Sequence, residues 1–93
     1  MALAEVATLE GHTDSVWQIA WCPTAPMLAS VGADRTLRLW SRNAAGWKLS
    51  HTLDEAHSRS VRACAWAPGG RRLASASFDA TVAVWTREGD NWE

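Results

Sequence analysis

The sequence has no tyrosine, one phenylalanine and two cysteines among its 93 residues, and it contains no long apolar run. Cys22 and Cys64 form no C-x-x-C pair and do not make the disulfide framework of a small secreted domain, so a reducing compartment fits best. No segment approaches the roughly 20 apolar residues of a membrane span. The start, MALAEVATLEGH, has no cationic leader, and Glu5 interrupts its short apolar stretch. We therefore expect a cytoplasmic protein, also compatible with the nucleus, without membrane contact.

The chain also lacks an excess of charge of either sign. Its formal net charge is -1, and 20% of its residues are charged. This balance provides no basic field that would hold the phosphates of a nucleic acid, so a nucleic-acid partner is not expected. A chain of 93 residues has room for one small domain whose core is marginal in size. Further stability is expected to come from contact with partners.

What the sequence does contain is an internal repeat. The segment LASVGADRTLRLW, residues 28–40, returns as LASASFDATVAVW, residues 73–85, at an offset of about 45 residues. Trp21 falls on Trp66 at the same offset, and matched Trp, His, Pro and Asp residues are poor candidates for chance. Repeats of this period are typical of stacked or circular architectures, whose units cannot bury their faces alone.

Each repeat is expected to form short β-strands. No stretch sustains apolar residues at helical spacing, and the apolar segments are rich in β-branched or aromatic side chains between Pro, Gly and Asp turn signals. In TVAVW, Ala83 replaces the polar position of TLRLW, so both faces of this strand are expected to be covered. The strands expected in the first repeat are 15–21, 27–33, 36–40 and 46–53.

The order of these strands predicts how the chain is organised. The opening EVATLEGH matches the end of KLSHTLDEAH, the segment that leads into the second repeat. We therefore expect a single unit of two four-stranded repeats, about 10–53 and about 54–93. Residues 1–9 are expected to be an outer strand that completes a neighbouring unit. The second repeat is expected to lack an outer strand of its own.

The repeated residues resemble those of the WD40-repeat β-propeller family. The signs are Gly-His at 11–12, a Pro-ended inner strand, LAS followed by a turn Asp, and an apolar strand closing in Trp. Trp40-Ser41 and Trp85-Thr86 depart from the eponymous Trp-Asp. LEGHTDSVW and SRSVRACAWAP look most like the first two blades of the cytosolic iron-sulfur assembly WD40 proteins. The resemblance implies an all-β fold with two four-stranded blades per chain, completed to a closed propeller by homo-oligomerisation.

In propellers of this family a His, a strand Ser, a turn Asp and a strand Trp form a hydrogen-bonded tetrad. Such a network would give the buried Trp N–H a hydroxyl acceptor, and the Asp would fix the tautomer of the imidazole. By position, the resemblance implies two structural tetrads: His12, Ser30, Asp34 and Trp40, and His57, Ser75, Asp79 and Trp85.

Ser, His and Asp together are also the residues of a hydrolytic triad. Nothing in the sequence resembles the Gly-x-Ser-x-Gly elbow that exposes a nucleophile, and Ser30 and Ser75 lie within expected strands. The His and Cys residues match no zinc spacing, and there is no H-E-x-x-H motif and no glycine-rich phosphate loop. We expect no enzymatic activity, no catalytic residues, no metal and no cofactor.

The resemblance also implies a docking surface for partners. Propellers of this family usually bind partners on the top face, through residues just after the inner-strand Val and just before the turn Asp. A Trp, a Phe and an Arg on one rim have the composition of an interaction hot spot, although Trp17 and Phe78 packing against adjacent blades is an equal alternative. The expected partner-binding residues are Ser15, Trp17, Ala33, Arg35, Ser60, Arg62 and Phe78.

Two blades alone would leave an apolar face at each end and an unpaired strand edge. A head-to-tail interface that closes into a ring would cover both. We expect a homotetramer with eight blades, or else a trimer with six, within the range of about 4 to 8 known for propellers. The rival is an amino-terminal piece of a seven-bladed protein. In the ring, the blade that ends at Trp85 is closed by a neighbour's strand, Val6, Ala7, Thr8 and Leu9.

The expected function is a non-enzymatic scaffold for protein-protein interaction, with a protein or peptide bound on the top face. The subfamily likeness implies an alternative, a component or fragment of a cytosolic iron-sulfur cluster assembly protein that recognises client apoproteins. Its partners would then be iron-sulfur assembly proteins. An evolutionary or engineered intermediate without a dedicated partner also stays open.

Overall fold

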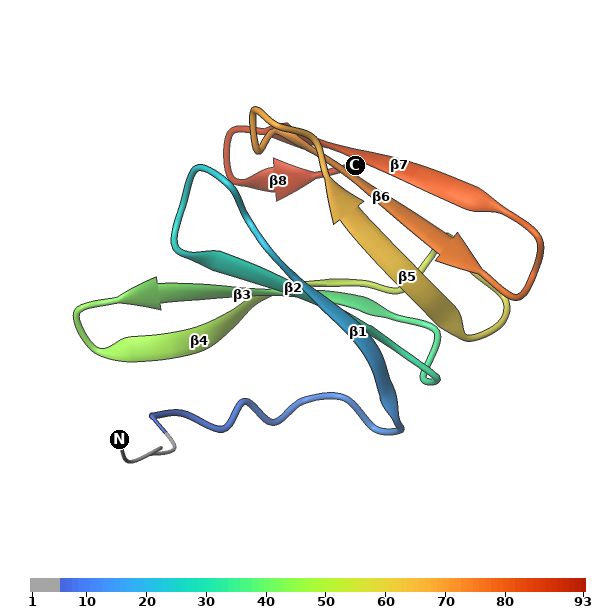
Figure 1. Ribbon diagram of the computed structural model, residues 1–93, viewed down its shortest axis with the longest axis horizontal. Helices are drawn as coiled ribbons and strands as arrows, with labels where there is room; N and C mark the ends of the chain where they lie inside the picture. The colour runs from blue at the N-terminus through green and yellow to red at the C-terminus, as the bar shows by residue number, and fades with distance from the viewer. Residues whose placement is uncertain (1–5) are drawn as a thin grey trace, which may run out of the picture.

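The computed structural model describes residues 6–93, which form two four-stranded antiparallel sheets and no helix (Figure 1). The predicted all-β class with two four-stranded units is confirmed. Strand order within each sheet follows the chain, β1-β2-β3-β4 in sheet A and β5-β6-β7-β8 in sheet B. The bounds are Val16–Trp21, Met27–Gly32, Leu37–Asn43 and Gly46–Leu53 for β1 to β4, and Val61–Trp66, Arg72–Ser77, Val82–Glu88 and Asn91–Trp92 for β5 to β8.

The turns that follow the second strand of each sheet have the same backbone conformation. Arg35 and Ala80 occupy the same repeat position, and their φ angles are 69° and 70°. A left-handed residue other than glycine costs about 1–2 kcal/mol, so these turns need support from side chains. Asp34 and Asp79 supply it, because each carboxylate accepts the amide of the threonine that follows the left-handed residue. The same turn chemistry fixes where each carboxylate points.

The outer strand of sheet B differs from the expectation. We expected none, but β8 is present as two residues, Asn91 and Trp92, which pair with Glu88 and Arg87 of β7. The backbones of Thr86 and Glu93 add two further hydrogen bonds. Within residues 6–93, nothing pairs with the outer edge of β7 from its start at Val82 to Trp85. Most of that edge is therefore open.

The core lies between the two sheets. Side chains of β2 and β3, among them Val31 and Leu39, are fully buried against Val61, Cys64 and Leu73 of sheet B. Two hydrogen bonds join β1 to β5 across this interface: the Cys64 amide donates to Gln18 Oε1 at 2.6 Å, and the indole N–H of Trp66 donates to the Ala20 carbonyl at 3.0 Å. The interface is thus apolar at its centre and fixed in register by polar groups of β1 and β5.

The opposite face of sheet B is open, and the expectation that both faces of TVAVW are covered is wrong for the single chain. We use repeat equivalent for the residue at the same position in the other repeat. Val82 and Val84 are 69% and 64% exposed, whereas their repeat equivalents Leu37 and Leu39 are 1% and 0% exposed. The reason is that sheet A has sheet B against it, whereas residues 6–93 place no third sheet beyond sheet B (Figure 1).

The segment before β1 passes along sheet A on the side away from sheet B (Figure 1). Residues 6–9 form no strand, and Val6 is 95% exposed. The expected outer strand is thus not formed in the single chain. Ala7 and Leu9 line a hollow with Trp40, just as Leu53 and Asp54 line one with Trp85. Residues 1–5 of that expected strand lie outside the described residues.

Gly70 in the turn between β5 and β6 gives a test of the packing between the sheets. It is buried and has a φ of 73°, and a Cβ there would collide with the Thr24 hydroxyl and lie 3.2 Å from the Cys22 sulfur of sheet A. We expect Gly70→Ala to lower the free energy of unfolding by about 1–3 kcal/mol in urea denaturation. Gly89→Ala is the control, since Gly89 has a similar φ of 62° and a Cβ there meets no atom within 4 Å. Equal effects of the two substitutions would contradict the packing.

Candidate functional site

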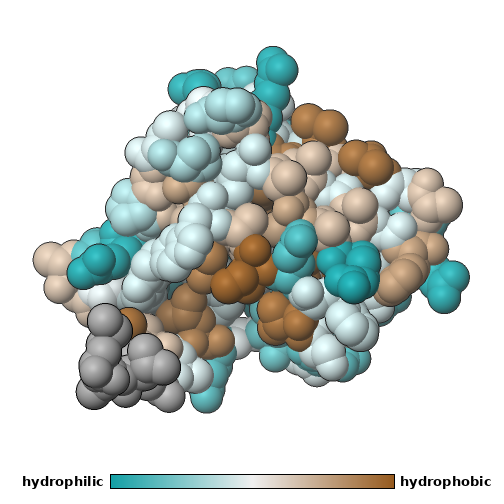
Figure 2. Space-filling view, viewed as in Figure 1, coloured by the Kyte–Doolittle hydropathy of each residue, from teal (hydrophilic) through white to brown (hydrophobic). Residues whose placement is uncertain are grey.

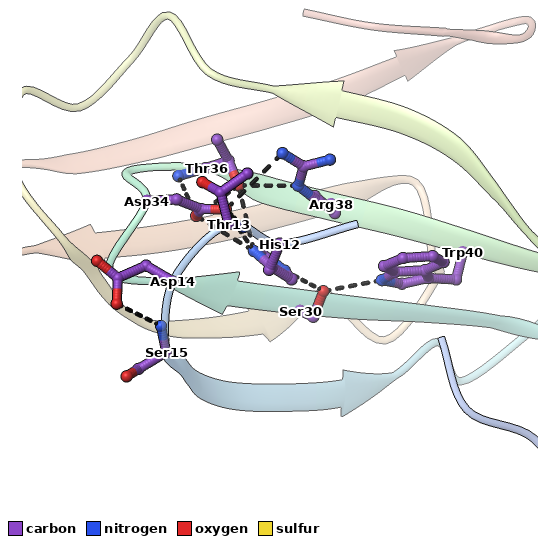
Figure 3. A network of polar contacts seen from close by, with 9 residues as sticks. All are labelled: His12, Thr13, Asp14, Ser15, Ser30, Asp34, Thr36, Arg38 and Trp40. Atoms are coloured by element: carbon purple, nitrogen blue, oxygen red, sulfur yellow. Dashed lines mark hydrogen bonds and ion pairs between the residues drawn. The ribbon is translucent and has the colours of Figure 1, made fainter. Parts of the chain in front are cut away.

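The first tetrad residues lie together on the face of sheet A that points away from sheet B (Figure 3). The indole N–H of Trp40 donates to Ser30 Oγ at 2.8 Å, and Ser30 Oγ lies 2.7 Å from His12 Nε2. His12 Nδ1 lies 2.9 Å from Asp34 Oδ2. Ser30 and Trp40 are both buried, at 4% exposure. A chain of hydrogen bonds therefore runs from β3 through β2 to the segment before β1 and back to the turn that holds Asp34.

The second tetrad residues repeat this arrangement between the two sheets. His57 Nε2 lies 2.8 Å from Ser75 Oγ, and the Trp85 indole N–H donates to the same oxygen at 3.2 Å. His57 Nδ1 lies 3.3 Å from Asp79 Oδ2. The structure thus places all four side chains of each set in one network.

One arrangement of protons satisfies every group in these networks. The Trp indole donates to the Ser oxygen, the Ser hydroxyl donates to the bare Nε2 of the imidazole, and the imidazole Nδ1–H donates to the carboxylate. The imidazole is then neutral, with its tautomer set by the Asp. Each Ser oxygen holds two buried partners, so losing it would leave two polar groups unsatisfied.

The two carboxylates are held in the charged form. Burial raises the pKa of Asp34, but hydrogen bonds from the Thr36 hydroxyl, the Thr13 amide and His12 outweigh burial and keep that pKa below its ordinary value. For Asp79, the hydroxyl of Thr81 lowers the pKa most, and further hydrogen bonds keep it well below the ordinary value against the opposing effect of burial. Both groups are therefore anionic acceptors at neutral pH.

Thr36 and Thr81 belong to the networks and were missed in the sequence. The Thr36 hydroxyl donates to Asp34 Oδ1 at 2.8 Å, and the Thr81 hydroxyl donates to Asp79 Oδ1. Thr81 Oγ1 also lies 3.0 Å from His57 Nδ1. The signal was present, because D-R-T and D-A-T align in the two repeats with the Thr in register.

The geometry of these networks does not suit nucleophilic chemistry. Ser75 is 1% exposed and its oxygen is engaged by two partners, so no substrate reaches it. Burial raises the pKa of the Cys64 thiol to about 11, which keeps it protonated at neutral pH. Among the described residues there is no group of three or more His, Cys, Asp or Glu side chains arranged to hold a metal ion.

His51 of β4 contacts the turn that precedes β8. Its Nε2 lies 2.6 Å from the carbonyl oxygen of Asp90 in the turn before β8, and its Nδ1 is buried without a hydrogen-bond partner. The hollow beside it is also lined by Lys48, Arg87 and Trp92. His51 thus joins β4 to the end of sheet B.

The expected partner-binding residues gather where β1 and β5 begin and where β2 and β6 end. The guanidinium of Arg62 lies 5.3 Å from the centre of the Trp17 ring, within cation-π range. Trp17 is 45% exposed and Phe78 is 53% exposed. The Ser15 carbonyl accepts the Ala33 amide and the Ser60 carbonyl accepts the Phe78 amide, which joins each strand start to the adjacent turn. Arg35 is exposed in the first of these turns.

These seven residues form what we call the rim, defined by the strand starts and the turns that carry them. Trp17 and Arg62 are the pair that the structure brings into direct contact across the two sheets. The part of the chain that the structure describes has no helix with the length and apolar character needed to cross a membrane.

Comparison with known proteins gives one family. The model of the WD domain, G-beta repeat, matches residues 3–41 and 47–86. The chain is similar to a probable cytosolic iron-sulfur protein assembly protein CIAO1 homolog of Ixodes scapularis, with 43% identity over 50% of this chain and 15% of the relative. A CIAO1 homolog of Chlamydomonas reinhardtii is 48% identical over 57% of this chain and 16% of its own length.

The fold is similar to a solved structure as well. The crystal structure of Sqt1 from Saccharomyces cerevisiae superimposes with a TM-score of 0.79 and 30% sequence identity, over 88% of this chain and 22% of Sqt1. The chain thus corresponds to less than a quarter of each of these longer proteins.

Proposed function

The chain belongs to the WD40-repeat family, as its resemblance indicated, and from this premise we propose that it is a non-enzymatic scaffold that binds a protein or peptide partner at the rim. The contact of Arg62 with Trp17 carries the proposal. Trp and Arg are the residues most enriched in binding hot spots, and their exposed stacking gives a partner a rigid apolar and cationic surface. Repeat position alone does not require this pair, because Trp17 and Arg62 are repeat equivalents of different chemistry.

Trp17 and Phe78 have an alternative role, which is to pack against other blades instead of binding a partner. Trp17 and Phe78 would pack against further blades if the rim were covered. At 45% and 53% exposure they keep about half of their surface available in the single chain. This favours binding, since a fully packed aromatic side chain would offer a partner no surface.

Affinity capture tests the rim. Wild-type protein is expected to retain its partner, and the double variant Trp17→Ala with Arg62→Ala is expected to lose it, because hot-spot residues cost about 2 kcal/mol or more each. The control is Arg42→Ala with Leu49→Ala, which removes an exposed Arg and an exposed apolar side chain from the far end of sheet A. Capture that is unchanged in the rim variant, or lost equally in the control, would refute binding at the rim.

We also propose that copies of the chain assemble head to tail into a ring, with four copies and eight blades preferred over three copies and six. Support comes from the open edge of β7 and from the segment 6–9. In sheet A, Leu37 and Arg38 pair with Leu53 and Thr52 of the outer strand. Since TL at 8–9 matches TL at 52–53, a neighbour's Leu9 would pair with Val82, the repeat equivalent of Leu37.

A second candidate function is a part in cytosolic iron-sulfur protein assembly. It is supported by the names of the relatives and implies a cytoplasmic location, while nothing found supports a nuclear one. The test is restoration of iron-sulfur enzyme activity by this chain in cells that lack the corresponding WD40 protein. Restoration by wild type and not by the rim double variant would support client binding at the rim. No restoration by wild type would refute this candidate and leave the scaffold proposal in place.

A further inference from the structure

The two sheets carry the same pair of tryptophans in different surroundings. Trp21 and Trp47 in sheet A have ring centroids 5.6 Å apart, and their repeat equivalents Trp66 and Trp92 in sheet B have centroids 5.7 Å apart. The pair in sheet B lies in the interface between the sheets, where Trp92 is 8% exposed. The pair in sheet A lies at the open end of the molecule, and Trp21 is 65% exposed. The pair in sheet B thus packs against a neighbouring sheet, whereas Trp21 of the pair in sheet A is largely in solvent.

Trp66 shows what such a pair does when it is engaged. Its indole N–H donates to the Ala20 carbonyl on β1 at 3.0 Å. Its ring packs against the buried cluster that includes Ala29 and Leu39 of sheet A. The side chain therefore works as a key, with an apolar body in a hollow of the neighbouring sheet and a polar tip on a backbone acceptor.

The hollow that would receive a second key is present on the open face of sheet B. It is lined almost wholly by apolar atoms, and Ala65, Ala74 and Val84 are among its residues. These three are the repeat equivalents of Ala20, Ala29 and Leu39. Figure 2 shows exposed hydrophobic side chains, in brown, over β1 and again over the upper part of sheet B. We call this hollow the socket.

We propose that Trp21 of one copy inserts into the socket of a second copy and donates its indole N–H to the carbonyl of Ala65. This inference rests on the proposed head-to-tail assembly and names the contact that makes it. Both surfaces belong to this chain, and their contact within the chain is already formed once, between Trp66 and sheet A. A second copy therefore fits the socket, because its Trp21 can repeat the packing and the hydrogen bond that Trp66 makes within the chain.

One difference between the two interfaces sets the strength of the proposed contact. Within the chain, Gln18 Oε1 accepts the Cys64 amide across the sheets at 2.6 Å. The repeat equivalent of Gln18 is Ala63, which has no side-chain acceptor, so this second bond is not reproduced between copies. Association thus depends on the Trp21 key more than the internal interface depends on Trp66.

Two variants and their mixture test this contact by mass measurement in solution. Trp21→Ala removes the key and Val84→Glu places a charge in the socket, and each alone is expected to raise the concentration at half assembly by about thirtyfold or more. Both residues are largely exposed in the single chain, so folding is expected to survive, as circular dichroism will check. Arg59→Ala changes an exposed side chain outside the key and the socket, so it is the control and should leave assembly unchanged.

The mixture gives an outcome that only a head-to-tail contact produces. A Val84→Glu copy keeps its key and a Trp21→Ala copy keeps its socket, so the two should form a dimer that grows no further. Trp21→Phe keeps an aromatic ring but is smaller and loses the indole N–H, and we expect it to raise the concentration at half assembly about tenfold.

The outcomes separate this contact from the assembly itself. An assembled wild type whose mass is unchanged by Trp21→Ala and Val84→Glu would refute the key and socket and leave the ring standing on another surface. A wild type that remains a single chain at every concentration would refute both, and would favour further blades of a longer protein as the cover of these faces. If the Trp21→Ala and Val84→Glu variants unfold when alone, their mixture decides. A mixture that stays unfolded, or that grows beyond a dimer, would also refute the contact of Trp21 with the socket.

Discussion

Replacing Leu39 by alanine is expected to lower the free energy of unfolding by about 2–5 kcal/mol, because the side chain is fully buried between the sheets. The same truncation at Val84, its repeat equivalent, is expected to change the stability of an isolated chain by no more than about 0.5 kcal/mol, since 64% of that residue is in solvent. Urea denaturation of the two variants at low protein concentration measures both effects. The difference between the two variants therefore measures the effect of a neighbouring sheet that packs over the residue.

Protein concentration is the control for this pair. If a second copy covers the open face of sheet B, the cost of Val84→Ala should rise to about 1–2 kcal/mol at concentrations where chains assemble, because two methyl groups then leave a buried site. The loss of stability caused by Leu39→Ala should not change with concentration, since Leu39 is buried by sheet B of the same chain. A Val84→Ala effect that is small at all concentrations would mean that the face stays open in solution.

Ser30→Ala is expected to lower the free energy of unfolding by about 2–4 kcal/mol. The substitution removes the acceptor of the Trp40 indole and the partner of His12 Nε2 together, and each orphaned buried group costs about 1–3 kcal/mol. A double-mutant cycle with Trp40→Phe measures the share that belongs to the indole. In the background without the indole N–H, the cost of Ser30→Ala should fall by about 1 kcal/mol.

Ser30→Thr is the matched control for the hydroxyl, because it keeps the oxygen and suits a strand. It should recover a large part of the stability that Ser30→Ala loses. Equal losses of stability in Ser30→Ala and Ser30→Thr would show that the hydroxyl group contributes nothing and that only packing at this site matters. Additive effects of Ser30→Ala and Trp40→Phe would show that the two side chains do not share a hydrogen bond of consequence.

Sequence patterns could predict the strands because local signals agree in both repeats. LASVG and LASAS are followed by an Asp turn, and TLRLW and TVAVW alternate, so period and turn chemistry point to the same elements. The grouping of the tetrad residues followed from the family resemblance. Thr36 was overlooked because a Thr beside a turn reads as a strand former, whereas here its hydroxyl is fixed by the Asp34 carboxylate.

The surroundings of a strand could not be predicted from its own residues. Val82 and Leu37 are both apolar at one repeat position, yet their exposures of 69% and 1% differ because only sheet A has another sheet on that side. The same reasoning applies to residues 6–9, whose pattern fits a strand although they form none in the single chain. The contact of His51 with Asp90 could not be predicted for a related reason, since it joins residues far apart in sequence.

Light scattering of the unmodified chain over a wide concentration range tests most directly whether its two open faces cover each other. We predict a particle of four times the chain mass of 10.2 kDa, falling apart on dilution, with three copies as the other closed ring. A mass of 10.2 kDa at every concentration would contradict it.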